Sequence, residues 1–275
     1  MPELPETETI ARDLDEALRG RRIVDAEVRR PDVLREVDAG ELTRRTAGAR
    51  IERVWRRAKL VVLDLSNAER VVVQPRFTGA LLLDAGALDE RERRYSTLDF
   101  FLDDGRRLHY RDIRRLGTVS LMPPDRFERY VGTLGPEPLD PAWGARELTE
   151  LLRSSRQPVK KVLMDQRRLA GIGNIYANEA LWRAGILPAR AAGSIAPDEA
   201  ARLHGALRAV LEESIALRGT SFRDYRDASG NRGRFAERLQ AYGRGGQPCA
   251  GCGHALAESH SVDGRSTVWC DRCQR

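Results

Sequence analysis

The four cysteines of this 275-residue chain form two Cys-x-x-Cys pairs near its carboxyl end, at Cys249, Cys252, Cys270 and Cys273. Four thiolates in two such pairs, seventeen residues apart, are typical of a tetrahedral structural zinc site. Two local disulfides or a redox pair are the alternatives, but an intracellular protein disfavours both and neither explains the duplicated spacing. We therefore expect one structural Zn²⁺, with no open coordination position for catalysis.

Between the two cysteine pairs, the run SVDGRSTVW combines a turn signal with an alternating segment. This pattern predicts a β-hairpin that is too small to fold without the metal, and it places Arg265 near the hairpin tip.

Lysine is rare in this chain. Of 47 basic residues, the only lysines are Lys59, Lys160 and Lys161. An ammonium is a compact charge that can be placed beside a phosphate, a task for which the planar guanidinium is not equivalent. These lysines are therefore candidate functional residues, although chance retention in an arginine-rich chain is the alternative for each.

The run LAGIGNIYANEALWRAGI places Gly171 and Gly173 in a tight turn and Asn174 as the cap of an apolar-striped helix. Amides exposed at such a helix start can hold a phosphate, whereas ordinary helix packing is the alternative. The formal charge of +6 and the isoelectric point near 9.4 also favour a polyanionic partner. Lys160, on the preceding predicted helix, favours phosphate.

The amino terminus reads MPELPETETI. Pro5 suits a first helical turn, and Glu6 and Glu8 complement the positive end of the helix dipole. Apolar residues then recur every four positions, so residues 5–19 are predicted to form an amphipathic helix. Helix initiation does not account for Pro2.

In the rest of the chain, the spacing of apolar residues changes twice, first to the alternation of strands and then to the period of helices. Alternating runs predict strands at 22–29, 50–55, 59–65, 70–74, 98–112 and 117–122, with a hairpin turn at 103–105. Five prolines between Met122 and Trp143 predict a linker without helix. Helical patterns follow at 145–155, 158–166, 174–185 and 197–219.

No segment reaches the roughly 20 apolar residues that a membrane span needs, and the amino terminus lacks a signal-peptide pattern. We therefore expect a cytoplasmic, nucleoid-associated monomer without a membrane partner.

Taken together, PELPETETI, DQRRLAGIGNIYANEALWRAGILP, YGRGGQPCAGCG and GRSTVWCDRCQ resemble the formamidopyrimidine glycosylase and endonuclease VIII family of base-excision repair enzymes. The resemblance covers essentially the whole chain and is greatest to the formamidopyrimidine-DNA glycosylase branch. It implies an α+β fold with three parts: a catalytic antiparallel β-sandwich with an N-terminal helix at 1–134, a helix-two-turn-helix domain with a lesion-capping loop at 135–238, and a four-cysteine zinc-finger β-hairpin at 239–275.

The resemblance also implies roles for individual residues. After removal of Met1, Pro2 would attack C1′ of the damaged nucleotide, because a terminal secondary amine is partly unprotonated near neutral pH and forms a cationic iminium. Glu3 would transfer protons, the alternative being compensation of the helix dipole. Lys59 would lie near the lesion and its phosphate, and Arg265 would clasp a phosphate and assist elimination. Further DNA contacts are implied for Lys160, Asn174, Phe77, Arg114 and Leu116, the last three as a wedge that fills the space left by the extruded base.

The wedge departs from the family pattern. QPRFTG stands where HLGMSG is usual, and DIRRLG stands where DPRRFG is usual. Gln74, Phe77 and Leu116 are the main replacements, and a core position at a strand end is the alternative for Phe77. These changes leave the proline chemistry intact and bear on the opposite-base preference.

The expected function is a bifunctional glycosylase and abasic-site lyase acting on double-stranded DNA with oxidised purines or abasic sites. The run GTSFRDYRDASGNRGRF resembles the family's lesion-capping loop and favours 8-oxoguanine and formamidopyrimidines, although a flexible linker has the same composition. The alternatives are an endonuclease VIII-like enzyme for oxidised pyrimidines and a non-catalytic damage-binding zinc protein. A zinc-ribbon transcription or recombination factor would account only for the last forty or so residues.

Overall fold

A computed structural model describes residues 2–86 and 88–275, which fold into two compact units. Unit 1 contains the chain up to Gly132 together with Ile215–Ala236, and unit 2 contains Thr133–Ser214 and Glu237–Arg275. The chain thus returns to unit 1 for a short segment before it completes unit 2. Among the described residues, no helix has the length and apolar character needed to cross a membrane.

Unit 1 contains two sheets. The first has the strand order β2-β9-β5-β4-β3 and the second the order β1-β7-β8-β6. All pairs are antiparallel except β2 with β9. The strands are β1 (Ile23–Val28), β2 (Leu34–Arg35), β3 (Ile51–Arg57), β4 (Leu60–Leu65), β5 (Arg70–Gln74), β6 (Gly79–Asp84), β7 (Ser96–Leu102), β8 (Arg107–Asp112) and β9 (Thr118–Met122).

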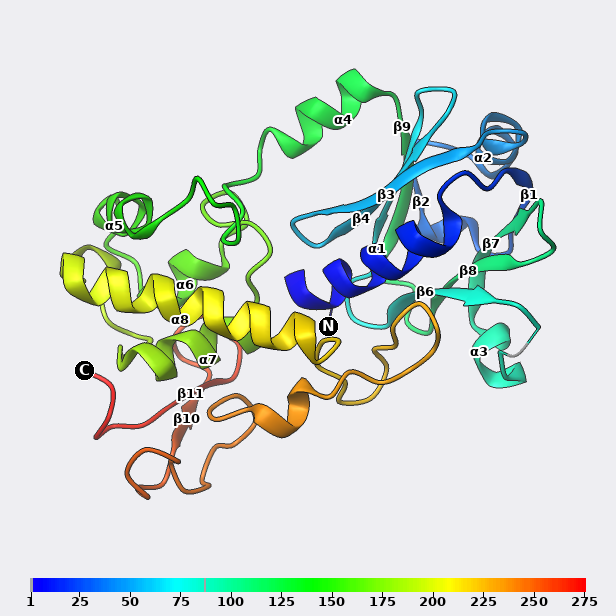
Figure 1. Ribbon diagram of the computed structural model, residues 1–275. Coiled ribbons are helices and arrows are strands. Elements are labelled where there is room, and N and C mark those ends of the chain that lie inside the picture. Colours follow the sequence, from blue (N-terminus) through cyan, green and yellow to red (C-terminus); the bar gives the residue numbers. More distant parts are fainter. Residues whose placement is uncertain (1, 87) are drawn as a thin grey trace. The chain divides into compact units, whose positions relative to one another are not determined.

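Helix α1 (Leu4–Leu18) confirms the predicted N-terminal helix and lies along β3 and β4 (Figure 1). Its buried residues Ile10, Leu14 and Leu18 join residues from both sheets in one hydrophobic core. Because apolar positions recur every four residues, the helix buries one face. The short helices of this unit are η1 (Pro31–Val33), α2 (Ala39–Thr46), α3 (Glu90–Arg94) and α4 (Pro124–Val131).

The predicted strands and the β7–β8 hairpin are confirmed, but the two-residue β2 was not predicted, and neither was β6. Its sequence GALLLD lacks alternation because nearly every residue of the strand is buried. The prediction of a linker without helix between Met122 and Trp143 was wrong at α4. Pro124 occupies the first helical turn, where a missing N–H costs nothing, and the next proline follows after the helix has ended.

Unit 2 contains the four predicted helices, α5 (Ala145–Arg153), α6 (Val159–Met164), α7 (Asn174–Ala184) and α8 (Pro197–Ala216), the last of which ends in unit 1. Helix α7 packs against α6 and against β11 (Thr267–Trp269), which pairs with β10 (Ala257–Ser259) in the predicted hairpin. Two 3₁₀ turns complete the elements, η2 (Ala192–Ser194) in this unit and η3 (Phe235–Arg238) where the chain leaves unit 1.

Candidate active site and nucleic-acid interface

Pro2 and Glu3 lie buried at the start of α1. Glu3 is the N-cap residue, and its backbone N–H donates to Oε2 of Glu6 at 2.8 Å. The other carboxylate oxygen of Glu6, Oε1, accepts from the backbone N–H of Thr220 at 2.7 Å. The Glu6 carboxylate therefore joins the start of α1 to the segment that follows α8. From the sequence alone, only a helix-dipole role could be predicted for Glu6, because its second partner, Thr220, lies more than two hundred residues away.

The segment 219–235, here called the capping loop, belongs to unit 1 and is fixed to the rest of that unit at and beside its start. Gly219 has a φ of +83°, and a Cβ there would lie 3.0 Å from the Glu6 side chain, so glycine is needed for this approach. Arg218 pairs with Asp13 of α1 and donates through Nε to the buried Asp227 at 2.8 Å. Asp227 in turn accepts from the backbone N–H groups of the turn that follows it. The capping loop is thus built into the fold and is not a simple linker.

Lys59 lies half-buried in the tight turn between β3 and β4. Ala58, beside it, has a φ of +53°, and its carbonyl accepts from Thr7 Oγ1 at 3.5 Å and from Arg56 at 3.2 Å. Arg56 also pairs with Glu8 at 2.7 Å. These contacts hold the Lys59 turn against the first turn of α1, so the structure brings together the segments that carry Pro2, Glu3 and Lys59.

Phe77 is 48% exposed and Leu116 is 40% exposed, so neither belongs to the core. Phe77 lies in the turn between β5 and β6, and Leu116 in the turn between β8 and β9. The guanidinium carbon of Arg114 lies 5.3 Å from the centroid of the Phe77 ring, a cation–π geometry. The three predicted wedge residues therefore come from two adjacent turns, and two of them are in contact.

Asp112 organises both wedge turns. Its buried carboxylate accepts from the hydroxyl of Thr78, from the N–H of Arg114 at 3.2 Å and from the N–H of Gly117 at 2.7 Å. A Cβ at Gly117 would overlap the Tyr110 hydroxyl, so the close packing of the two turns requires glycine there. Arg76 and Arg115, one in each turn, have φ values of +51° and +52°, in the left-handed region.

In unit 2, Lys160 is fully buried on α6. Its Nζ donates to Thr267 Oγ1 at 2.7 Å and to the Ser266 carbonyl at 3.2 Å, and it pairs with Asp263 at 3.3 Å. All three partners lie in or beside the turn of the cysteine hairpin. Arg265 is exposed in the same turn, as predicted. Lys160 thus supports the turn that displays Arg265.

The N-cap of α7 is Gly173, so the prediction that Asn174 caps this helix was wrong. Asn174 is the first helical residue, and its Nδ2 donates to the Ser266 carbonyl at 3.0 Å. Asn178, one turn later, is fully buried and accepts from the Val268 N–H at 2.8 Å. The sequence analysis missed Asn178, whose spacing from Asn174 places both amides on one helix face.

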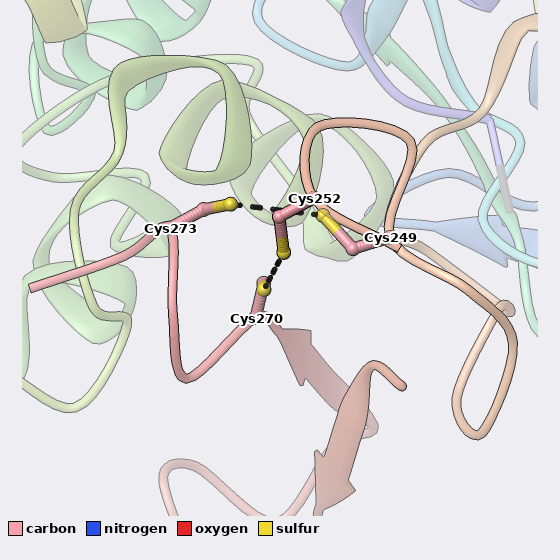
Figure 2. Close-up of side chains that lie close together, drawn as sticks. All are labelled: Cys249, Cys252, Cys270 and Cys273. Carbon is pink, nitrogen blue, oxygen red and sulfur yellow. Dashed lines mark hydrogen bonds between the residues drawn. The ribbon is translucent and has the colours of Figure 1, made fainter. Parts of the chain in front are cut away.

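The four cysteine sulfurs lie within 4.8 Å of one another (Figure 2). Cys252 and Cys270 are separated by 3.5 Å between sulfurs, and Cys249 and Cys273 by 3.9 Å. A tetrahedral site with Zn–S bonds of about 2.3 Å requires sulfurs about 3.8 Å apart. The four thiol groups and the distances between their sulfurs therefore fit a tetrahedral metal ion with bonds of the Zn–S length.

Two family models match the chain. The formamidopyrimidine-DNA glycosylase N-terminal domain covers residues 1–119, and the H2TH domain of the same enzymes covers residues 134–226. The chain belongs to the formamidopyrimidine-DNA glycosylase family.

Relatives named formamidopyrimidine-DNA glycosylase match most or all of the chain. The protein from Heliobacterium modesticaldum is 41% identical over 278 residues, covering 100% of both chains. The protein from Moorella thermoacetica is 46% identical over 258 residues, covering 93% of each.

Solved structures agree with this assignment. The MutM (Fpg) protein from Thermus thermophilus has a TM-score of 0.86 at 36% identity and covers 99% of this chain and 98% of its own. A Lactococcus lactis Fpg mutant in complex with DNA containing Fapy-dG has a TM-score of 0.91 at 30% identity, with 100% of both chains covered.

Proposed function

We propose that this protein is a base-excision repair enzyme that removes oxidised purines from double-stranded DNA and cleaves the resulting abasic site. The observation that carries the proposal is the buried Pro2–Glu3 start of α1, linked through Glu6 to the capping loop. Solved structures of Lactococcus lactis Fpg in complex with DNA that contains Fapy-dG or an abasic site support the substrate class.

The proposed nucleophile is the Pro2 amine after removal of Met1. Its lone pair attacks C1′ as the glycosidic bond breaks, and the proton that the amine nitrogen loses is transferred to the departing base. Glu3 protonates the ring oxygen as the sugar opens, which leaves an iminium between Pro2 and C1′. Loss of the C2′ proton then expels the 3′ phosphate, and loss of the C4′ proton expels the 5′ phosphate. Water hydrolyses the remaining iminium and frees the Pro2 amine. Lys59 and Arg265 are proposed to stabilise the phosphates during these steps.

We further propose that Phe77, Arg114 and Leu116 fill the space left by the extruded nucleotide, and that Lys160 and Asn174 serve the phosphate contact made at the hairpin turn. The cysteines are proposed to hold one structural Zn²⁺, which would supply folding energy and no catalytic chemistry. The division into segments 1–134, 135–238 and 239–275 and the intracellular, DNA-associated location remain proposals.

The variant Pro2→Gly tests the proposed nucleophile. Glycine replaces the terminal secondary amine with a primary amine, so iminium trapping should weaken or be lost, and base release and strand cleavage should fall together. Binding of a lesion duplex should be largely retained, because the DNA-contacting residues are unchanged. Pro5→Ala, which changes the other proline of the same helix start, is the matched control and should retain activity. Unchanged cleavage by the Pro2 variant would remove this residue from its proposed role.

A further inference from the structure

Arg111 of β8 is the largest fully buried side chain in the described part of the chain, with 1% of its surface exposed. Its guanidinium reaches three separate segments. One nitrogen donates to the Thr78 carbonyl at 3.2 Å, another donates to the Asp224 carbonyl at 2.9 Å, and Nε lies 2.7 Å from the Glu92 carboxylate. A single side chain thus connects a wedge turn, the capping loop and α3.

Burying a guanidinium is unfavourable unless its charge and its donors are matched. Burial lowers the pKa of Arg111, and the neighbouring Glu92 opposes that shift. An apolar side chain would fill the same space at a lower desolvation cost, but it would make none of the three polar contacts. The planar fork of arginine is suited to holding the two carbonyls at fixed angles, while Nε, which makes no hydrogen bond, keeps the charge beside the Glu92 carboxylate.

The capping-loop end of this connection has an exposed tip at residues 222 and 223, although Tyr225 just beyond it is buried in the core. Phe222 is 47% exposed, and Arg223 beside it is also exposed. A cavity of about 430 Å³ lies between this tip and the sheet, and both residues line it together with Arg111 and Ile113. Since the tip lies over this cavity, the bond from Arg111 to the Asp224 carbonyl holds it toward the sheet on one side, and the buried Tyr225 anchors the chain on the other.

The other end of the connection lies at the wedge. Thr78 directly follows Phe77, and its hydroxyl donates to Asp112, the residue after Arg111. Asp112 also holds the turn that carries Arg114. A shift of the Arg111 guanidinium would therefore change the positions of both wedge turns and of the capping loop.

We propose that Arg111 is a positioning residue that couples the capping loop to the wedge, so that capture of the damaged base and insertion of the wedge occur as one event. This inference rests on the proposed function, because it assigns the loop to the base and the wedge to the duplex. Arg111 touches neither the sugar nor the base in this account and acts through Asp224 and Thr78.

The proposal distinguishes two substrates. An abasic duplex offers no base for the loop to hold, so its cleavage should depend little on Arg111. Excision of 8-oxoguanine requires the ordered loop, and a loop displaced by about 1 Å costs up to about a hundredfold in rate. The ratio of the two rates is a readout that general destabilisation would not move.

The test compares Arg111→Met and the milder Arg111→Lys with Arg107→Met. Arg107 lies on the same strand with its side chain exposed over the Phe101 ring, so it matches the loss of charge without the three contacts. Hydrogen exchange of the unliganded proteins is measured at residues 222–226. Single-turnover rates are then measured on an 8-oxoguanine:cytosine duplex and on an abasic duplex, below the unfolding temperature of each variant.

We expect both Arg111 variants to exchange faster at 222–226 and to lose about ten- to a hundredfold in 8-oxoguanine excision relative to abasic cleavage, while Arg107→Met behaves like the parent. Unchanged exchange in the loop would overturn the proposal whatever the activities are. Faster exchange with an unchanged ratio of rates would also overturn it. Failure of the parent to act on either duplex would instead refute the proposed function, which the exchange experiment does not require.

Discussion

The variant Lys160→Met distinguishes two roles of Lys160, which are anchoring of the hairpin turn and direct contact with a DNA phosphate. Its ammonium is fully buried and pairs with Asp263, whose side chain is 7% exposed. Methionine fills the volume but leaves the Asp263 carboxylate without this partner. Removing one member of a buried pair costs about 3–5 kcal/mol, so the free energy of unfolding of unit 2 should fall by about that amount.

The assay is denaturant unfolding followed by tryptophan fluorescence, since Trp269 lies on β11 of the hairpin. Metal release to a chelator is measured in parallel and should be faster in the variant, because the hairpin turn has lost its anchor. Lys161→Met is the matched control. Lys161 is the next residue of α6 and is exposed, so the same change of charge should alter stability by less than about 0.5 kcal/mol.

One result would refute this reasoning. If Lys160→Met were as stable as Lys161→Met and retained its metal, the buried contacts would not anchor the hairpin. A weaker salt dependence of DNA binding in that stable variant would then show that Lys160 contacts a phosphate directly.

Three further predictions concern the wedge, the sandwich and the metal site. Arg76→Gly should raise the stability of unit 1 by about 0.5–1 kcal/mol in thermal unfolding, because a φ of +51° is strained for arginine; a loss would contradict this. Burial raises the pKa of Asp99, but hydrogen bonds from His109 and Ser96 and the charge of Arg29 outweigh it and hold that pKa below its usual value. The stabilisation from the Asp99 carboxylate is therefore present above about pH 4 and lost as the pH falls through the folded-state pKa. Asp99→Asn should reduce the loss of stability at acid pH, as measured by unfolding across that range. An unchanged loss would refute the assignment. Cys270→Ser should lose metal and DNA affinity together, as measured by metal analysis and titration of a duplex; full affinity without metal would contradict a structural role.

The local features of the fold could be predicted from the sequence. The four-residue apolar period of α1 and the alternation of the β7–β8 hairpin each fix a structure within one short segment. The cysteine spacing predicts the hairpin because the sulfurs must converge on one point. In contrast, β6 is buried along nearly its whole length and carries no alternation, and α4 was concealed by two prolines that suit a helix start.

Contacts between distant segments could not be predicted. In the sequence, Glu6 is only an acidic residue in a first helical turn, and its bond to the Thr220 N–H depends on the folded chain. Lys160 is likewise only a basic residue of a predicted helix, and its burial depends on contact with the hairpin turn. Arg111 has no signal in its own strand, since its three partners come from three other segments. Such residues are chosen by the assembled fold, and a single sequence does not record which segments will meet.

The central claim, that the Pro2 amine is the nucleophile, is tested most directly by trapping. The full-length protein is mixed with an 8-oxoguanine:cytosine duplex and borohydride, and the mass and attachment site of the protein–DNA adduct are determined. The account predicts one adduct, attached at Pro2 in a chain that has lost Met1. Attachment at another residue, or no adduct on any lesion or abasic duplex when Pro2 is the free terminus, would contradict it.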